Sequence, residues 1–534
     1  MNQQDDIQKR LMVFFLIVSM FMIGYYIYGS YFSEKNIPKE EARNVETKQT
    51  QNNANPQPPQ KNDLSSNTVT YNSTGNFNLI LDGRRLNADN LQNTVKIETK
   101  YGYIEFSKIG GRIISIFINK YNTDIISNFS KTNKIFPGEI ITTNPDITML
   151  LNFTEYSYQR EGDKIIFTLN HEGISIKKQF VLNPLGDISV DIQIQGLKNL
   201  GTALINGVSL DDEGSFGHTG AIVKTEKGLI KIDNDIEAER IIRGKIYFAG
   251  EENKYFMQIF AFKNPLQIVH VVPVAENKTV TFTEIPTYTE GFFYGGAKLY
   301  SLLGELTQKY KKEWGVDLSL RDTIDFGFFG ILGKPLFIVL HFIYDYIPNW
   351  GIAIIILTIL LRILFFPLNH KSLKAMKKMA DLAPEIEKLR KKYAKDPQKL
   401  QQEIMKLYSE AGANPMSGCL PILVQIPVFI ALYNVLMVTV ELKNVPFLWI
   451  PDLSDKDPYY ILPILMGLSM IAQQWITPSS DKNQKMIMYI MAGVFTFLFM
   501  NFPAGLVLYW LTNNILGLLQ SLIINRQLGR HKKQ

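Results

Sequence analysis

The sequence contains almost no cysteine, and this scarcity limits how the chain can be stabilised. Cys419 is the single cysteine among 534 residues, so no disulfide can form within the chain. Six histidines are scattered without the spacing of metal ligands, and we expect neither a metal nor another cofactor. Any exported domain must therefore be held together by its own apolar core.

Motifs that support catalysis are missing as well. The sequence contains no nucleophile elbow, no phosphate-binding loop and no paired carboxylates placed for acid–base chemistry. Cys419 has no evident histidine partner and stands at the start of an apolar stretch, where packing is the simpler role. We therefore do not expect an enzyme.

Charge is almost absent from six long windows, although 20% of all residues are charged. The first window, residues 11–32, ends in an aromatic belt without a cleavage site, so we expect a retained membrane anchor. The other windows are residues 350–368, 419–440, 459–476, 486–502 and 506–524. All approach the length of about 17–25 residues that a spanning helix needs, which predicts a multi-pass α-helical membrane protein with six transmembrane helices.

Two contrasting regions separate the anchor from the second span. Residues 33–75 are rich in Asn, Gln and Pro, which is typical of a flexible linker. Residues 76–320 alternate β-prone runs with turn residues, and this pattern predicts an all-β sandwich. The clearest runs are residues 94–99, 102–106, 164–169, 255–262 and 279–283. Helical spacing at the end of this region predicts a helix through Leu299, Leu302, Leu303, Leu306 and Tyr310.

The distribution of basic residues sets the expected orientation, because cytoplasmic loops are enriched in Lys and Arg. The loop 370–418 carries 11 Lys and Arg, whereas the loop 441–458 carries two Lys and four acidic residues. With six spans and a cytoplasmic N-terminus, the loop 370–418 lies in the cytoplasm and the β domain lies on the opposite side of the membrane. A seventh span at 331–345 would reverse this pattern, so we expect an interfacial helix there, interrupted by Pro335.

Arg362 lies within an apolar window, and none of the six windows contains Asp or Glu. A charge at this depth costs several kcal/mol unless water or a partner stabilises it. One explanation is that the side chain snorkels toward the cytoplasmic surface, about 10 Å away by helical rise. The other is a wet cavity that receives a transient anionic guest, and we favour the cavity.

Polar side chains in the other spans support this cavity. They are Gln425, Asn434, Gln473, Gln474, Thr512, Asn513, Asn514 and Gln520. Thr358 lies four residues before Arg362 and shares its helix face. Each polar residue alone is better explained by interhelical hydrogen bonding. Together with an arginine that lacks a carboxylate, they favour a water-filled groove.

The basic loop is predicted to form a helical hairpin within residues 371–414. Two apolar stripes have helical spacing, and Asp396 followed by Pro397 supplies an N-cap with proline at the first helical position. Solvation on the inner side explains most of its lysines. Contact with anionic lipid or ribosomal RNA is a secondary explanation.

Four stretches resemble the Oxa/YidC/Alb family of membrane protein insertases, in its Gram-negative form with a large periplasmic domain. They are residues 351–371, 414–433, 457–467 and 502–509. The outer domain matches that form in size and position rather than through a motif. The resemblance implies a periplasmic β-supersandwich and a five-helix insertase core with a hydrophilic groove open to cytoplasm and lipid.

The resemblance also implies that the chain inserts and helps fold nascent inner-membrane proteins, alone or with the Sec translocon (SecYEG and SecDF). The expected substrate groove comprises Arg362, Thr358, Gln425, Asn434, Gln473, Tyr509, Trp510 and Asn514. Relatives often have two tyrosines where this chain has Tyr509 and Trp510, so no hydroxyl role is implied at the second position. Expected further partners are the ribosome, through the basic hairpin and tail, and anionic lipids, with no DNA.

The expected organisation places both termini in the cytoplasm of a cell with an inner membrane. Its parts are a tip and anchor (1–32), linker (33–75), periplasmic β domain with a final helix (76–320), interfacial helix (321–349), second span (350–369), basic hairpin (370–418), four further spans (419–525) and basic tail (526–534).

Two other classes of protein stay open. A multi-pass transporter of a small anion would use Arg362 as the binding charge, although the chain lacks a repeated half. A membrane-anchored carbohydrate-binding or mutarotase-like protein would need a His, Asp and Glu cluster in the outer domain.

Overall fold

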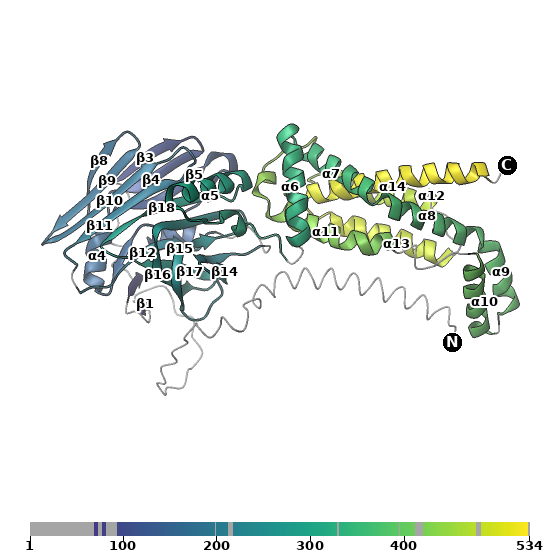
Figure 1. Ribbon diagram of the computed structural model, residues 1–534, viewed down its shortest axis with the longest axis horizontal. Coiled ribbons are helices and arrows are strands. Elements are labelled where there is room, and N and C mark those ends of the chain that lie inside the picture. Colours follow the sequence, from purple (N-terminus) through teal and green to yellow (C-terminus); the bar gives the residue numbers. More distant parts are fainter. Residues whose placement is uncertain are drawn as a thin grey trace, which may run out of the picture. The chain divides into compact units, whose positions relative to one another are not determined.

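The computed structural model describes residues 69–72, 77–81, 93–197, 199–211, 217–327, 330–394, 396–411, 420–476 and 482–531. These residues form a β-rich unit that ends at Asp325 and a helical unit that begins at Phe326 (Figure 1). The predicted anchor at 1–32 and Cys419 lie outside the described residues.

The β-rich unit consists of antiparallel strands, most of them in one sheet of 12. The main order is β14-β13-β15-β16-β18-β11-β10-β9-β8, and β17, β12 and β7 continue from β16 as a branch. Its strands are β7 (Ile140–Thr142), β8 (Ser157–Glu161), β9 (Lys164–His171), β10 (Ile174–Leu182), β11 (Ile188–Gln195), β12 (Thr202–Val208), β13 (Gly220–Thr225), β14 (Gly228–Asp233), β15 (Arg240–Glu252), β16 (Phe256–Ala275), β17 (Lys278–Glu284) and β18 (Tyr288–Ala297). A four-stranded sheet comprises β3 (Thr94–Thr99), β4 (Gly102–Ser107), β5 (Arg112–Ile118) and β6 (Thr123–Asp124).

The five runs predicted as strands are all strands, in β3, β4, β9, β16 and β17. In β11 the alternate residues Ile188, Val190, Ile192 and Ile194 are buried, as expected for a strand with one face on a core. β16 continues well past the predicted end at residue 262, through Pro265. That proline lies between the segment paired with β18 and the segment paired with β17, at an irregularity in the pairing with β15. A missing N–H is tolerated at such a bulge.

The prediction of a linker up to residue 75 is wrong at its carboxyl end. Val69–Asn72 form strand β1, which pairs with β2 (Asn78–Leu81). The sequence Val-Thr-Tyr is β-prone, and its backbone pairs with β2. This pairing stabilises a strand here although the surrounding residues are mostly polar.

Helix α5 (Tyr300–Trp314) confirms the helix predicted at the end of the β-rich unit. Leu303, Leu306 and Tyr310 are buried along one face, and the Tyr310 ring stacks on Phe292 with centroids 4.0 Å apart. Gly315 ends the helix in the left-handed conformation, with φ of 72°, and its N–H donates to the Lys311 carbonyl. The unit also contains the short helices α3 (Asn128–Asn133) and α4 (Pro145–Phe153).

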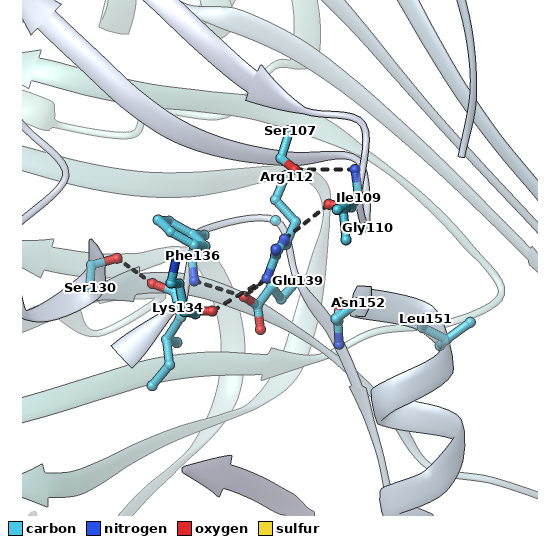
Figure 2. Close-up of polar contacts among 12 residues, drawn as sticks. Ser107, Ile109, Gly110, Arg112, Ser130, Lys134, Phe136, Glu139, Leu151 and Asn152 are labelled. Atoms are coloured by element: carbon cyan, nitrogen blue, oxygen red, sulfur yellow. Dashed lines mark hydrogen bonds and ion pairs between the residues drawn. The ribbon is translucent and has the colours of Figure 1, made fainter. Parts of the chain in front are cut away.

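A buried ion pair lies inside the β-rich unit (Figure 2). The side chains of Arg112 and Glu139 are both fully buried, and Arg112 Nη1 donates to Glu139 Oε1 at 2.9 Å. The guanidinium also donates to the carbonyl oxygens of Ile109 and Lys134, at 3.1 and 3.3 Å. Glu139 accepts a further bond from the Phe136 backbone N–H at 2.9 Å. This arginine is therefore neutralised and positioned from several sides.

The described part of the helical unit contains nine α-helices. They are α6 (Gly330–Tyr346), α7 (Trp350–Leu364), α8 (Phe366–Asp381), α9 (Ala383–Lys392), α10 (Pro397–Glu410), α11 (Leu420–Val438), α12 (Ile461–Ile476), α13 (Lys482–Phe499) and α14 (Ala504–His531). α14 packs against α7, α11 and α12, and α6 packs against α7 and α11. Figure 1 shows α9 and α10 side by side beyond the end of α8, as the predicted hairpin requires.

Two local predictions in the helical unit need correction. Pro335 lies inside α6 without interrupting it. The lost hydrogen bond falls near the helix start, and burial of Phe337, Leu340 and Ile343 offsets it. The second span ends as a helix at Leu364 rather than at residue 368, and α7 meets α8 at a bend of 64°. Pro367 is the reason, because it has no N–H for the carbonyl one turn earlier.

The number of membrane spans stays a prediction. Within the described residues, Ala504–Ile524 is long and apolar enough to cross a membrane, and the bent pair α7 and α8 passes the same test when joined. Val424–Val438, Ile461–Ile476 and Met488–Phe499 are apolar but shorter. α14 also continues beyond the predicted last span, so part of the predicted basic tail is helical.

Candidate functional site

Arg362 lies in the last turn of α7 and reaches across to α14. Its Nη2 donates to the backbone oxygen of Asn513 at 2.8 Å. The side chain is half-buried, and its Nε is buried without a hydrogen-bond partner among the described residues. No ion pair to an acidic side chain is formed by Arg362 within the described parts of the chain. The guanidinium therefore meets a neutral oxygen, and its charge is not cancelled there.

Tyr509 and Gln425 form the second element of the site. Gln425 Nε2 donates to the Tyr509 hydroxyl, which joins α11 to α14. Tyr509 is fully buried and close enough to Arg362 for an electrostatic interaction. These three predicted groove residues are thus brought together by α7, α11 and α14.

Trp510 belongs to a different environment from its neighbour. Its ring contacts Phe429, Phe495 and Phe499, at centroid distances of 4.8, 6.1 and 5.3 Å. The rings come from α11 and α13, so Trp510 packs in an aromatic cluster. Trp510 therefore contributes an aromatic packing surface, and these contacts do not require a hydroxyl group.

Gln473 and Asn514 connect α12 to α14. Gln473 Nε2 donates to the Ser521 hydroxyl at 2.9 Å, and Asn514 Nδ2 donates to the Ser469 hydroxyl at 3.0 Å. Neither serine could be predicted as a site residue, because a serine in an apolar helix is common and has no spacing signal. The two bonds form a polar seam along the face that α14 presents to α12.

Thr358 and Asn434 have local partners. Thr358 is buried and donates to the Ile354 carbonyl of its own helix at 2.7 Å. Asn434 is buried and donates to the Phe326 carbonyl at 3.0 Å, where the chain enters the helical unit. The sharing of a helix face with Arg362 therefore does not direct the Thr358 hydroxyl at the guanidinium.

Gly517 is a site residue that the sequence did not predict. A Cβ added to Gly517 would lie 2.4 Å from Arg362 Nη2 and 3.6 Å from Gln473 Oε1. The guanidinium thus occupies the space that a side chain would fill. An isolated glycine in an apolar helix gave no signal beyond a local cost in helix propensity.

The basic hairpin has the predicted cap. The Asp396 side chain accepts from the Lys399 backbone N–H at 3.1 Å, and Pro397 begins α10. The last turn of α9 carries Arg390, Lys391 and Lys392. This surface is positively charged and suits a polyanion or an anionic lipid surface.

A cavity of about 290 Å³ in the β-rich unit is lined by Asp124, Lys131 and Asp211 among others. Its carboxylates serve the fold. Asp124 accepts from Ser115 and Lys131 at 2.5 and 2.6 Å, and Asp211 binds the backbone N–H of Asn128. The described residues contain no group of three or more His, Cys, Asp or Glu that could hold a metal ion.

Comparison with known proteins covers the whole chain. Residues 342–532 match the family model described as 60Kd inner membrane protein. The membrane protein insertase YidC of Aquifex aeolicus is 37% identical, over 100% of this chain and 99% of the relative. The membrane protein insertase YidC of Campylobacter jejuni is 32% identical, with the same coverage of both chains. A crystal structure of an active YidC insertase aligns with 81% of this chain and 92% of its own, at 19% identity and a TM-score of 0.41.

Proposed function

This chain belongs to the YidC family and is a membrane protein insertase, and from that premise we propose that Arg362 is the receiving charge of its substrate groove. Its substrates are nascent membrane proteins, and it is not an enzyme. The family predicted from the sequence is confirmed. The anion transporter and the carbohydrate-binding protein are not favoured.

The main support for this role is that Arg362 contacts a neutral backbone oxygen rather than a carboxylate. A guanidinium bound to a carbonyl keeps its charge and four further N–H groups for a second acceptor. An Asp or Glu in a hydrophilic segment of the client offers a stronger, charge-assisted bond than the carbonyl does. The arginine therefore attracts acidic segments as they enter the bilayer from the cytoplasmic side.

Polar pairs around Arg362 lower the cost of moving the client's polar segment. Gln425, Tyr509, Gln473 and Asn514 provide hydrogen-bonding groups between α11, α12 and α14. Transfer of a polar group into an apolar environment without such partners costs roughly 2–7 kcal/mol. In the proposed route, the polar segment stays hydrogen-bonded while it crosses part of the membrane.

Apolar side chains on the outer faces of the helices supply the complementary surface. Exposed examples are Ile363 and Leu364 of α7, Trp475 of α12 and Phe497 of α13. Apolar surface of this extent marks contact with lipid or with another protein. The apolar helix of the client passes along this surface into lipid, and its burial drives the step.

The proposed topology has six spans, with five in the insertase core. The β-rich unit is then a periplasmic supersandwich, the α8–α10 hairpin is cytoplasmic, and both termini are cytoplasmic. α6 lies at the membrane surface, because Ile331, Phe342 and Tyr346 are exposed while its other face packs on α7 and α11. The charge of the loops supports this orientation.

Partners follow from the same arrangement. The basic hairpin and the end of α14 contact the ribosome and anionic lipids, both of which carry dense phosphate charge. The Sec translocon (SecYEG and SecDF) is the proposed partner for clients with long exported regions.

Complementation in depleted cells tests the proposal. Cells in which this insertase is the sole copy receive the native chain, Arg362→Lys or Arg362→Ala, and insertion of a small two-span protein with an acidic exported loop is measured by protease protection. We expect Arg362→Ala to reduce insertion at least several-fold and Arg362→Lys to reduce it less, because lysine keeps the charge. Equal insertion by the native chain and Arg362→Ala would refute the role of the arginine.

A further inference from the structure

Gly517 determines where the guanidinium of Arg362 can lie. It is placed on α14 four residues after Asn513, whose carbonyl accepts the bond from Nη2. The ideal Cβ position at Gly517 is 2.4 Å from Nη2, far inside the closest approach of nonbonded atoms. Any side chain at this position therefore excludes the guanidinium from the place it occupies.

The spacing of four residues has a geometric reason. In an α-helix the Cα–Cβ bond tilts toward the N-terminus, so a side chain covers the turn that precedes it. The carbonyl of Asn513 is the one that residue 517 would cover. Glycine leaves that oxygen open from the side, and its second lone pair can accept a bond from outside the helix.

The same arrangement occurs a second time in this chain, in the β-rich unit. Arg321 Nε donates to the Tyr300 carbonyl at 2.8 Å, and the residue four positions later is Gly304. A Cβ on Gly304 would lie 2.2 Å from Arg321 Nη2. Two arginines thus bind helix carbonyls that a glycine uncovers, which supports a specific fit rather than a chance approach at Gly517.

We propose that Gly517 is a positioning residue for insertion, because it opens a binding place on α14 that holds the Arg362 guanidinium inside the groove. The proposal rests on the role of Arg362 proposed above and assigns the means by which the charge is kept at its depth. Without that place, the long side chain of Arg362 extends toward the cytoplasmic surface, where water and phosphates solvate it. Acidic segments of the client then bind the Arg362 guanidinium at the membrane surface, before they enter the groove.

Gly517→Ala tests this directly, and Gly493→Ala is its matched control. Gly493 is a helical glycine of α13, and a Cβ there would have no neighbour within 4 Å. Both changes favour helix formation equally. We expect Gly517→Ala to reduce insertion of a client with an acidic exported segment several-fold, whereas Gly493→Ala leaves it unchanged. A client with Asn and Gln in place of the acidic residues should be inserted equally by both variants.

A second variant separates positioning from folding. Lysine has a single terminal nitrogen and no planar fork, so Arg362→Lys removes the group that an alanine at 517 would displace. Gly517→Ala should therefore cause no further loss in the Arg362→Lys background. A loss of equal size in both backgrounds, or for acidic and neutral clients alike, would show a structural effect and overturn the inference.

A chemical measurement gives a readout that does not depend on insertion. The full-length chain in lipid nanodiscs is treated with phenylglyoxal, and modification of Arg362 is followed by mass spectrometry. We expect faster modification in Gly517→Ala than in Gly493→Ala, because the guanidinium leaves α14. Equal rates would contradict the inference while leaving the role of Arg362 intact. If Arg362→Ala itself spares the acidic client, the proposed role of the arginine fails and the inference fails with it.

Discussion

Arg112 and Arg362 are two partly or fully buried arginines with opposite surroundings. Arg112, in the β-rich unit, binds a buried carboxylate and two backbone carbonyls (Figure 2). Arg362, in the helical unit, binds one backbone carbonyl of Asn513, and its Nε has no hydrogen-bond partner in the described residues. The first charge is cancelled within the fold, whereas the second meets only a neutral oxygen among the described residues, and this contrast supports the proposed role of Arg362.

Lys178 stands between these extremes. It is fully buried in the β-rich unit and donates to the carbonyl oxygens of Gly110 and Gly138, at 2.6 and 2.8 Å. Burial, with the nearby Arg112, lowers the pKa of Lys178 to about 7, and Glu139 partly offsets this. A lysine can therefore become neutral on carbonyl partners, whereas an arginine keeps its charge. That difference agrees with the role proposed for Arg362, which requires a permanent charge.

The largest expected effect is on the stability of the unit that contains each arginine when that arginine is replaced by methionine. Arg112→Met leaves Glu139 buried without its cation, and loss of one member of a buried pair costs about 3–5 kcal/mol. Arg362→Met removes a charge that no carboxylate of the described chain offsets, so the helical unit should be as stable as before or more stable. Hydrogen–deuterium exchange of the full-length chain measures both units. Adding Glu139→Met to Arg112→Met should recover part of the lost stability of the β-rich unit. Destabilisation of the helical unit by Arg362→Met would contradict the difference between the two arginines.

The next effect concerns pH and Lys178. As the pH rises from 7 to 9 the folded state loses the proton of Lys178, while the unfolded chain still binds it, since the pKa of an unfolded lysine is near 10.4. The unfolded state then binds more protons, so Lys178 makes the β-rich unit more stable as pH rises, by at most about 1.4 kcal/mol per pH unit. Lys178→Met lacks this contribution. The melting temperature of the variant relative to the native chain should fall from pH 7 to pH 9, and a constant difference would contradict the shift.

A smaller effect tests the hydroxyl of Tyr509. Tyr509→Phe removes the hydrogen bond from the half-buried Gln425 amide, at a cost of about 0.5–1.5 kcal/mol. Trp510→Phe should cost less, because its contacts with Phe429 and Phe499 are between aromatic rings and partly remain. Thermal unfolding in nanodiscs ranks the two variants. A larger loss for Trp510→Phe would show that the aromatic cluster matters more than the polar contact.

Sequence periodicity predicted most of the elements but not their ends. The strand runs, α5 and the Asp396 cap are as expected, because each depends on neighbours close in the sequence. The ends of β16 and α7 and the continuity of α6 at Pro335 depend on tertiary partners that a local pattern does not contain. Pro367 was the one local sign of the bend after α7.

The site was predicted in part for the same physical reason. Arg362 and Gln425 could be named because charge and polarity in an apolar helix are visible in the sequence, whereas Tyr509 was named only through the resemblance to the family. The Asn513 carbonyl and Gly517 could not, because every residue has a carbonyl and only packing shows which one is uncovered. The local partners of Thr358 and Asn434 depend in the same way on backbone oxygens.

A double-mutant cycle between insertase and client tests the central claim most directly. Insertion of a client with one Asp in its exported segment, and of the same client with Asn, is measured for the native chain and for Arg362→Gln. The proposed role of Arg362 predicts that Arg362→Gln impairs insertion of the Asp client much more than insertion of the Asn client. An equal loss for both clients would contradict it.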